Sequence, residues 1–219
     1  GFNNVAVGSN GLTQVTEGSY NTSLGGNSGT TITTGNGNTC IGYDAQASAP
    51  DVSNEVTIGN DDVTKTRLKG EVQTTQDMTV NGIRVGVGAK GTTSNVVVGL
   101  NAFGTSSSTS AYNNVAIGQD SLSNISSAHD SVAVGLDALE LNTTGKNNVA
   151  IGSGSLGQNA EGENNTAIGY YAGGNMTSGD NNIVIGQNAQ TSANGVSNEV
   201  TIGNANITVT RLKGTVTAN

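Results

Sequence analysis

The sequence predicts an all-β fold in which a short repeat coils into a parallel β-solenoid. Three observations support this fold class. A phrase such as "NNVAIG" recurs along the chain with a period of 17 residues. The 219 residues include 33 glycines and a single proline, in a chain rich in Asn, Ser and Thr, which favours turns and short strands over helices. Only 33% of the residues are hydrophobic and 3% are aromatic, so a large globular core is excluded.

The repeat is aligned on the glycine that closes each phrase. The repeat glycines are Gly8, Gly25, Gly42 and Gly59, then Gly99, Gly118, Gly135, Gly152, Gly169, Gly186 and Gly203. Every step within the two sets is 17 residues, except one of 19 at the start of the second set. A fixed period of this kind indicates stacked structural repeats. We therefore predict a first roll of about four coils over residues 1–60 and a second roll of about seven coils over residues 94–204.

Each position of the repeat has its own chemical character. The residue before the glycine is a large aliphatic, such as Ile151, and the residue two positions earlier is nearly always β-branched, such as Val149. The residue between them is small in most repeats, such as Ala150. Side chains alternate across a strand, so we expect the large aliphatic residues to form the core and the small residues to form an outer face. The glycine is expected to end the strand with a positive φ.

The remainder of the 17-residue coil has room for a second short strand and two turns. An Asn precedes most of the strands, as Asn148 does, and this column is expected to form a hydrogen-bonded ladder along the stack.

A single coil is not expected to be stable alone. Ordering its 17 residues costs about 25 kcal/mol, whereas two buried aliphatic side chains return about 3–6 kcal/mol. The flat face of small residues would let a second copy of the strand approach closely. We therefore predict a symmetric homo-oligomer that uses the small-residue face as its contact.

The phrase "NNVAIG", followed by a turn and a small residue, resembles the head repeat of YadA-like trimeric autotransporter adhesins. The resemblance covers residues 1–60 and 94–204. It implies a left-handed β-roll and a homotrimer in which three rolls pack side by side. The repeat here is longer than the usual adhesin repeat, so its turns are expected to be enlarged.

A second phrase occurs at the end of both rolls. "SNEVTIGNDDVTKTRLKG" (53–70) returns as "SNEVTIGNANITVTRLKG" (197–214). It resembles the exit phrase of bacteriophage tail fibres, which in many of them leads into a C-terminal intramolecular chaperone that directs trimerisation and then cleaves itself off. The chain ends at "TVTAN", either as a mature fibre after self-cleavage or at an artificial boundary. It begins without Met and in mid-pattern, so we expect a fragment or a processed product.

Residues 61–93 are expected to contain the exit phrase and a connector, and residues 205–219 a truncated second exit phrase. Within the connector, residues 71–93 lose the 17-residue register. Apolar residues alternate there at Met78, Val80, Ile83, Val85 and Val87. This alternation predicts extended strand, intertwined among three chains. A flexible linker is the alternative.

The sequence offers little for catalysis or for a cofactor. The stretches at 152–157 and 86–91 match the dinucleotide pattern GxGxxG, but no helix is expected after either. His129, the only histidine, is adjacent to Asp130 and Ser131, and adjacent residues cannot adopt triad geometry. We expect His129 to be an exposed turn residue. One histidine and one cysteine cannot build a zinc site. We predict that the protein is not an enzyme and has no catalytic residue, cofactor or metal.

Charge limits the possible partners. The net charge is −8 with only 8 Lys and Arg, which disfavours nucleic acid. No apolar run approaches the roughly 18 residues of a membrane span, so membrane insertion is not expected. Asp61 and Asp62 are expected to be solvated turn charges, and a cation gathered by trimer symmetry is the alternative. Cys40 stands where other repeats have Ala or Ser, and we expect it to be a small buried residue.

These features favour a homotrimeric, structural or adhesive segment of a phage tail fibre, extracellular on the virion, that carries or contributes to receptor binding. Its partners would be other tail-fibre or baseplate proteins and a bacterial surface glycan or protein. Exposed rings on turns stack on sugar faces, and packing is the alternative role for each ring. The candidate contacts are Tyr43, Tyr112, Tyr170 and Tyr171.

Two rivals remain. The chain is alternatively the head of a trimeric autotransporter adhesin, which would bind host matrix or cells from the bacterial surface. An enzymatic tailspike would need an acidic pair in a groove, and the sequence offers no obvious one.

Overall fold

The computed structural model describes residues 1–69, 72, 74, 77–81, 83–88, 94–104 and 110–211. It divides into two compact units, Gly1–Val72 and Gln73–Asn219. The described residues contain β-strands and turns but no α-helix, and hence no helix of the length and apolarity that a bilayer requires. The predicted fold class, an all-β parallel solenoid with coils of about 17 residues, is confirmed.

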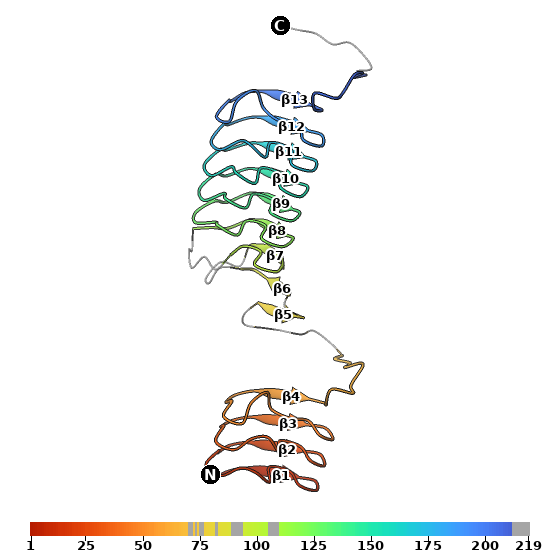
Figure 1. The fold of residues 1–219 in the computed structure, drawn as a ribbon. Coiled ribbons are helices and arrows are strands. Elements are labelled where there is room, and N and C mark those ends of the chain that lie inside the picture. The colour runs from red at the N-terminus through yellow and green to blue at the C-terminus, as the bar shows by residue number, and fades with distance from the viewer. Residues whose placement is uncertain are drawn as a thin grey trace. The chain divides into compact units, whose positions relative to one another are not determined.

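The first unit contains a four-stranded parallel sheet in chain order (Figure 1). Its strands are β1 (Val5–Val7), β2 (Thr22–Leu24), β3 (Thr39–Ile41) and β4 (Val56–Ile58). Each residue pairs with the one 17 positions later, as Ala6 does with Ser23. One strand of three residues per coil is therefore the rule, and the described residues do not contain the second strand that we predict for each coil.

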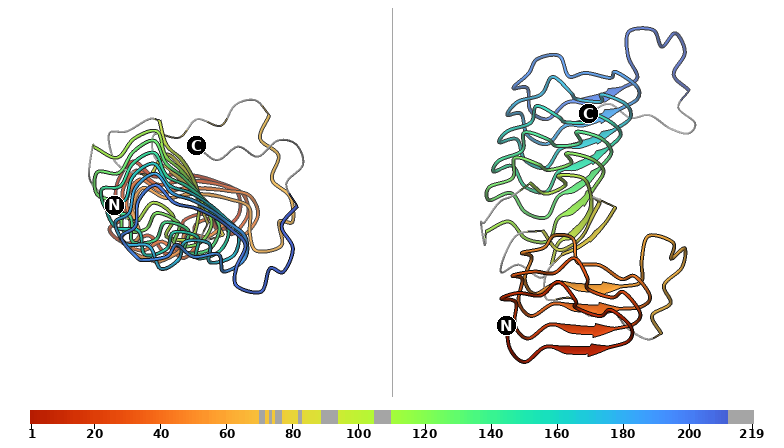
Figure 2. Two further views of the ribbon diagram at one scale, coloured as in Figure 1. Left: turned by 90° about the horizontal axis from the view of Figure 1, so that it is seen from above. Right: turned by 60° about the horizontal axis from the view of Figure 1, so that its bottom comes forward.

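The second unit contains a nine-stranded sheet. Its strands are β5 (Met78–Val80), β6 (Ile83–Gly86), β7 (Val96–Gly99), β8 (Val115–Ile117), β9 (Val132–Val134), β10 (Val149–Ile151), β11 (Thr166–Ile168), β12 (Ile183–Ile185) and β13 (Val200–Ile202). The strands from β7 to β13 are parallel and one coil apart, and in Figure 2 the coils of each unit stack in register.

The connector forms a β-hairpin within its own chain. β5 and β6 pair antiparallel around Asn81, and β6 pairs antiparallel with β7. The Nη1 of Arg84 donates to the carbonyl oxygens of Ala102 (3.2 Å) and Gly104 (2.7 Å) in the first coil of the roll. The prediction of strands in this segment is correct for β5 and β6, and their intertwining among three chains stays a prediction. The two strands close one end of the second roll.

The inside and outside of the strands are the reverse of the prediction. The small middle residue of each strand points into the coil, and Cys40, Ala116, Ala150 and Ala167 are all buried. The large aliphatic residues on either side of it point outward, and none of them is buried. The aliphatic column is therefore not the core of a coil, and the small residues do not form an outer contact face. Cys40 is buried, as predicted.

The small strand residues face inward because large residues from another column of the repeat occupy the coil interior. The sequence pattern did not assign this column to the core. Four residues after the repeat glycine, five of the eleven coils carry a large apolar residue that is buried: Leu12, Phe103, Leu122, Leu139 and Leu156. This column faces the middle residue of the strand, since a Cβ added at Gly173 in the same column would lie 3.7 Å from the Cβ of Ala167. The turns therefore supply most of the large side chains inside the coils, and the strands contribute mainly small residues, with Val97 and Val184 as exceptions.

Left-handed backbone shapes the turn. Leu122, Leu139 and Leu156 have φ values of 50°, 50° and 49°, a conformation that costs a non-glycine residue about 1–2 kcal/mol. Full burial of a leucine returns about 1.5–3 kcal/mol, so burial outweighs the strain. The repeat glycines also have positive φ, and at Gly118 a Cβ would lie 2.4 Å from the carbonyl oxygen of Gly135 in the next coil.

The predicted Asn ladder is present and joins each side chain to the backbone of the next coil. The Oδ1 of Asn165 accepts from the backbone N–H of Asn182 (3.0 Å). The Nδ2 of Asn165 donates to the carbonyl oxygen of Gly179 (2.7 Å). Asn21, Asn38 and Asn148 make the same two bonds. Each of these asparagines thus satisfies a donor and an acceptor of the following coil.

A glutamate ends the ladder in each roll. Glu199 occupies the Asn column in the last coil, and its carboxylate accepts from the N–H and Oγ of Ser192 and the Oγ1 of Thr201, all in its own coil. Glu55 makes the equivalent bonds to Ser48 and Thr57. These bonds, led by the serine hydroxyl, lower the pKa of both carboxyl groups. A carboxylate only accepts hydrogen bonds. It suits the last coil, where no following coil offers a carbonyl oxygen to a side-chain donor.

Replacing Asn165 by alanine should destabilise the second roll. Asn165→Ala leaves the buried Asn182 N–H and the Gly179 carbonyl without these partners, at about 1–3 kcal/mol each. Urea unfolding followed by circular dichroism measures the loss. The control is Asn164→Asp, an exposed left-handed neighbour, which should change stability by less than about 0.5 kcal/mol. Equal unfolding midpoints for the two variants would contradict the ladder's role.

The caps predict a pH dependence with a definite sign. Because the folded pKa of Glu199 lies below its ordinary value of 4.5, its stabilisation is complete above that value and is lost as pH falls through the folded pKa. Glu199→Gln should therefore be less stable than the parent at pH 7, and the gap should close towards pH 3. Urea midpoints at pH 7, 5 and 3 test this, and a gap that is constant with pH would refute it.

Candidate interaction surface

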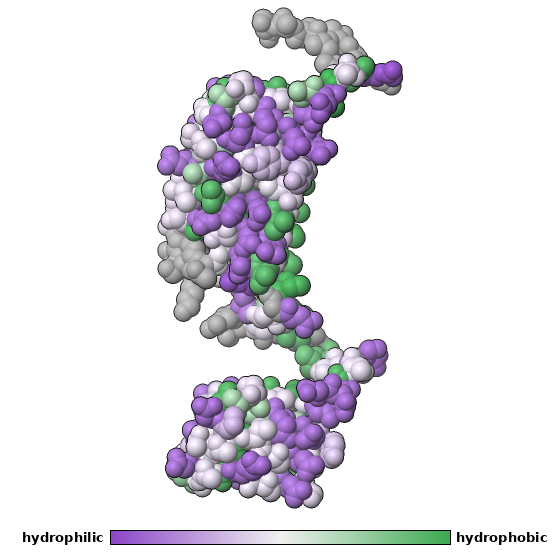
Figure 3. Space-filling model, viewed as in Figure 1, coloured by the Kyte–Doolittle hydropathy of each residue, from purple (hydrophilic) through white to green (hydrophobic). Residues whose placement is uncertain are grey.

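The outward aliphatic residues form a continuous apolar face on each sheet. In the second unit this face carries Ile117, Ile151, Ile168 and Ile185, which retain 37–41% of their exposure. Valine, isoleucine and one threonine occupy the other outward column of the same strands. No charged residue occurs in either outward column from β7 to β13. Figure 3 shows the apolar residues along the strand side of this unit.

The hairpin extends the same face. Val85 pairs with Val98 and with Met78, so these three side chains lie in one row across β7, β6 and β5. Val80 and Ile83 form a second pair, and all four apolar hairpin residues are exposed. At about 4.8 Å per strand, the nine strands make an apolar surface about 40 Å long. Monomeric proteins seldom leave so large an apolar strip uncovered.

The exit phrase covers the end of the first roll. The N–H of Asp62 donates to the Oδ1 of Asn60, which starts a tight turn. Val63 then lies against Gly59, where an added Cβ would be 2.5 Å from its Cγ2. Residues 61–69 are all exposed. Within the second exit phrase, residues 212–219 lie outside the described residues.

The four tyrosines predicted as receptor contacts lie on three different turns. Tyr43 is the most exposed, at 69%, and its ring stands over Gly26 of the preceding coil, where a Cβ would lie 3.5 Å from its Cδ2. Tyr170 and Tyr171 are neighbours with ring centroids 6.4 Å apart. Tyr112 stacks on His129 with centroids 4.7 Å apart and rings 5° from parallel. Their role as contacts remains a prediction.

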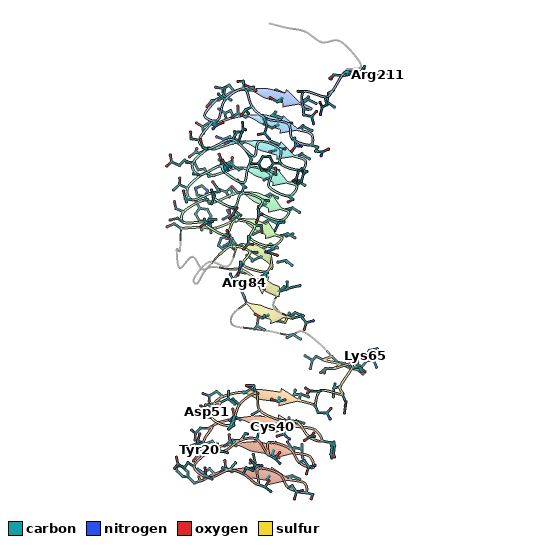
Figure 4. All side chains as sticks on the ribbon, viewed as in Figure 1. Tyr20, Cys40, Asp51, Lys65, Arg84 and Arg211 are labelled. Carbon is teal, nitrogen blue, oxygen red and sulfur yellow. The ribbon has the colours of Figure 1, made fainter. Side chains whose placement is uncertain are left out.

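Sequence reasoning omitted Tyr20. It is 59% exposed, projects from a turn of the first unit (Figure 4), and packs edge to face with Phe2 at a centroid distance of 5.5 Å. The sequence does mark Tyr20 as unusual, because most other repeats have asparagine at this position, directly before the Asn of the ladder.

His129 is not a freely exposed turn residue. Its side chain is 25% exposed because it stacks on Tyr112, and its Nδ1 lies 2.7 Å from the Oδ2 of Asp130. A hydrogen bond from Asn113, then the contact with His129, lowers the pKa of Asp130. The Oγ of Ser131 donates to the backbone carbonyl of His129 and accepts from the N–H of Asn148. Ser131 thus serves the ladder and does not form a triad.

The described parts of the other candidate sites bring no catalytic residues together. An open pocket of about 400 Å³ lies at the end of the first roll, lined by Asp44, Asp61 and Asp62 among others. Among the described residues, no three His, Cys, Asp or Glu side chains lie close enough to hold a metal ion. Burial, followed by the charge of Glu55, raises the pKa of the Cys40 thiol, which keeps it protonated and unreactive. The stretch at 152–157 is a turn of the repeat, and the other GxGxxG match extends beyond the described residues.

Comparisons with known proteins find no matching family model, no match among curated proteins and no match among solved structures. The interaction surfaces are therefore interpreted from their own chemistry.

The reversed strand orientation predicts opposite effects at two adjacent positions. Ala150→Leu should destabilise the roll by about 1–3 kcal/mol, because its side chain enters a filled coil. Ile151→Ser should leave the circular dichroism spectrum of the chain unchanged, because this side chain points outward. Urea unfolding of the two variants, in protein dilute enough to be monomeric, compares their stabilities. A greater loss of stability from Ile151→Ser would contradict the orientation.

Proposed function

We propose that the chain is a structural, adhesive fibre segment that assembles as a homotrimer through the apolar face of its sheets. The observation that carries the proposal is the strip of outward aliphatic residues, with at least one on every coil. Burying apolar surface contributes about 25 cal/mol per Å², so association would add stability that a single roll lacks.

A second copy of the chain fits this face better than a different partner. The strip is repetitive and uncharged, and it runs the length of each sheet, so it is complementary to itself and offers no charge pattern that would select another protein. The number of three copies follows from the resemblance of "NNVAIG" to the heads of YadA-like adhesins and of "TRLKG" to phage fibre exit phrases. The proposed contact face is the aliphatic one. It replaces the small-residue face predicted from the sequence, because the small residues are buried inside the coil.

The biological setting proposed is a bacteriophage tail fibre, extracellular on the virion and joined to other fibre or baseplate proteins. The trimer would present each contact site three times to a bacterial surface glycan or protein, and avidity would strengthen weak contacts. No enzymatic activity, cofactor, nucleic acid or membrane insertion belongs to this proposal. The rival is the head of a trimeric autotransporter adhesin, which the repeat itself favours.

Sedimentation equilibrium tests the assembly. The parent chain should sediment at three times its monomer mass of 21.8 kDa. The double variant Ile151→Asp with Ile168→Asp should shift the protein to monomer, because charges would enter the apolar contact. Asn147→Asp, on an exposed turn, is the matched control and should stay trimeric. A parent chain that remains monomeric at micromolar concentration would overturn the proposal.

A further inference from the structure

Two tyrosines occupy backbone positions that the repeat reserves for other residues. Tyr20 has φ 61° in a column whose other left-handed members are all Asn, Asp or Gly. Tyr171 has φ 54° in a second column of the same composition. Asn, Asp and Gly tolerate this conformation, whereas a bulky residue in it is an outlier.

Burial explains the left-handed leucines but not these tyrosines. Leu122, Leu139 and Leu156 are fully buried, so their strain is offset by the core. Tyr20 and Tyr171 keep 59% and 40% of their exposure. Strained residues of this kind concentrate at functional sites, because folding alone would favour a less strained residue.

Each strained tyrosine belongs to an exposed aromatic pair. Tyr20 packs against Phe2, whose carbonyl oxygen accepts from the Tyr20 N–H at 3.1 Å. Tyr171 adjoins Tyr170, and its ring is held between two glycines. A Cβ at Gly154 would lie 2.9 Å from its Cδ2, and a Cβ at Gly174 would lie 2.8 Å from its Cδ1. The ring is therefore fixed before any ligand arrives, which lowers the entropic cost of binding.

Amide side chains stand next to both pairs in the neighbouring coils. Asn3 precedes Tyr20 in its column, and Gln187 and Asn188 follow Tyr170 and Tyr171 in theirs; all three are exposed. Flat amphipathic rings beside adaptable amides suit a ligand with apolar C–H faces and many hydroxyls. The net charge of −8 opposes an anionic ligand.

We propose that Phe2 with Tyr20, and Tyr170 with Tyr171, are two contact sites for neutral oligosaccharides. The proposal rests on the proposed function, because it assigns the receptor contacts of the fibre to these pairs. It adds Phe2 and Tyr20 to the predicted receptor contacts. It keeps Tyr170 and Tyr171 as contacts but not Tyr43.

The test uses the full chain on an array of neutral and sialylated oligosaccharides. The parent should bind neutral glycans, and the double variant Tyr20→Asn with Tyr171→Asn should lose at least tenfold in binding. Because asparagine is common in both columns and tolerates positive φ, Tm should stay the same or rise by about 2–4 °C. Tyr43→Ser is the control, since Ser9 and Ser153 occupy the same column, and it should bind like the parent.

Several results would overturn the inference: no binding of the parent to any neutral glycan, binding to sialylated glycans only, or undiminished binding by the double variant. A fall in Tm would show that the tyrosines serve packing. Sedimentation of the same samples separates the two proposals. A trimer that does not bind neutral glycans refutes the contact sites alone, and a monomeric parent refutes the assembly.

Discussion

The structure depends on one constraint, the parallel pairing of each residue with the residue 17 positions later. Strand hydrogen bonds supply only three residues of pairing per coil, and the Asn column adds two bonds from inside the coil. The Oδ1 of Asn148 accepts from the N–H of Asn165 at 2.9 Å, and the next coil repeats the bond through Asn165 and Asn182. A coil shifted by one residue would lose every bond of this ladder. The period is therefore maintained by buried polar groups as much as by the strands.

Packing inside the coil also repeats with the 17-residue period. Where the fourth residue after the repeat glycine is itself glycine, as at Gly29 and Gly173, a large residue appears three positions later, as Ile32 and Met176. A Cβ at Gly29 would lie 2.8 Å from the Cδ2 of Leu12, and one at Gly173 would lie 3.0 Å from the Cδ2 of Leu156. Side chains from the preceding coil thus fill the space that these glycines leave.

The period and the ladder could be predicted from the sequence because each is a property of a repeated column. The repeat glycines and the Asn before each strand mark both directly. The side of the strand that faces inward could not be predicted from hydrophobicity, because Val149 and Ile151 are apolar and yet point out of the coil. The side that faces inward depends on side-chain volume in two columns. The turn column contributes large residues such as Leu156, and the middle strand column contributes small ones such as Ala150. The alternation over β5 and β6 predicts strands but not their partners, because it fits pairing within the chain and between chains equally well.

The aromatic sites show a related limit. Exposed tyrosines were selected from the sequence by residue type, and this selection omitted Tyr20, which only its φ value and its column distinguish. Backbone strain is invisible in composition, but it becomes visible once the repeat is aligned and the column's usual residue is known. Tyr43, in contrast, stands in a column that accepts many residue types and carries no such mark.

In the proposed assembly, the large aliphatic residues point out of each coil and become buried only between copies of the chain. Thiol labelling of Ile151→Cys with a maleimide measures this directly, since Cys40 is buried in the coil interior. The account predicts that Cys at position 151 reacts slowly in concentrated, assembled protein and rapidly after dilution to monomer. Rapid labelling at every concentration would show that no second copy covers the face. Slow labelling even in the diluted monomer would show that the residue points inward, and either result would contradict the account.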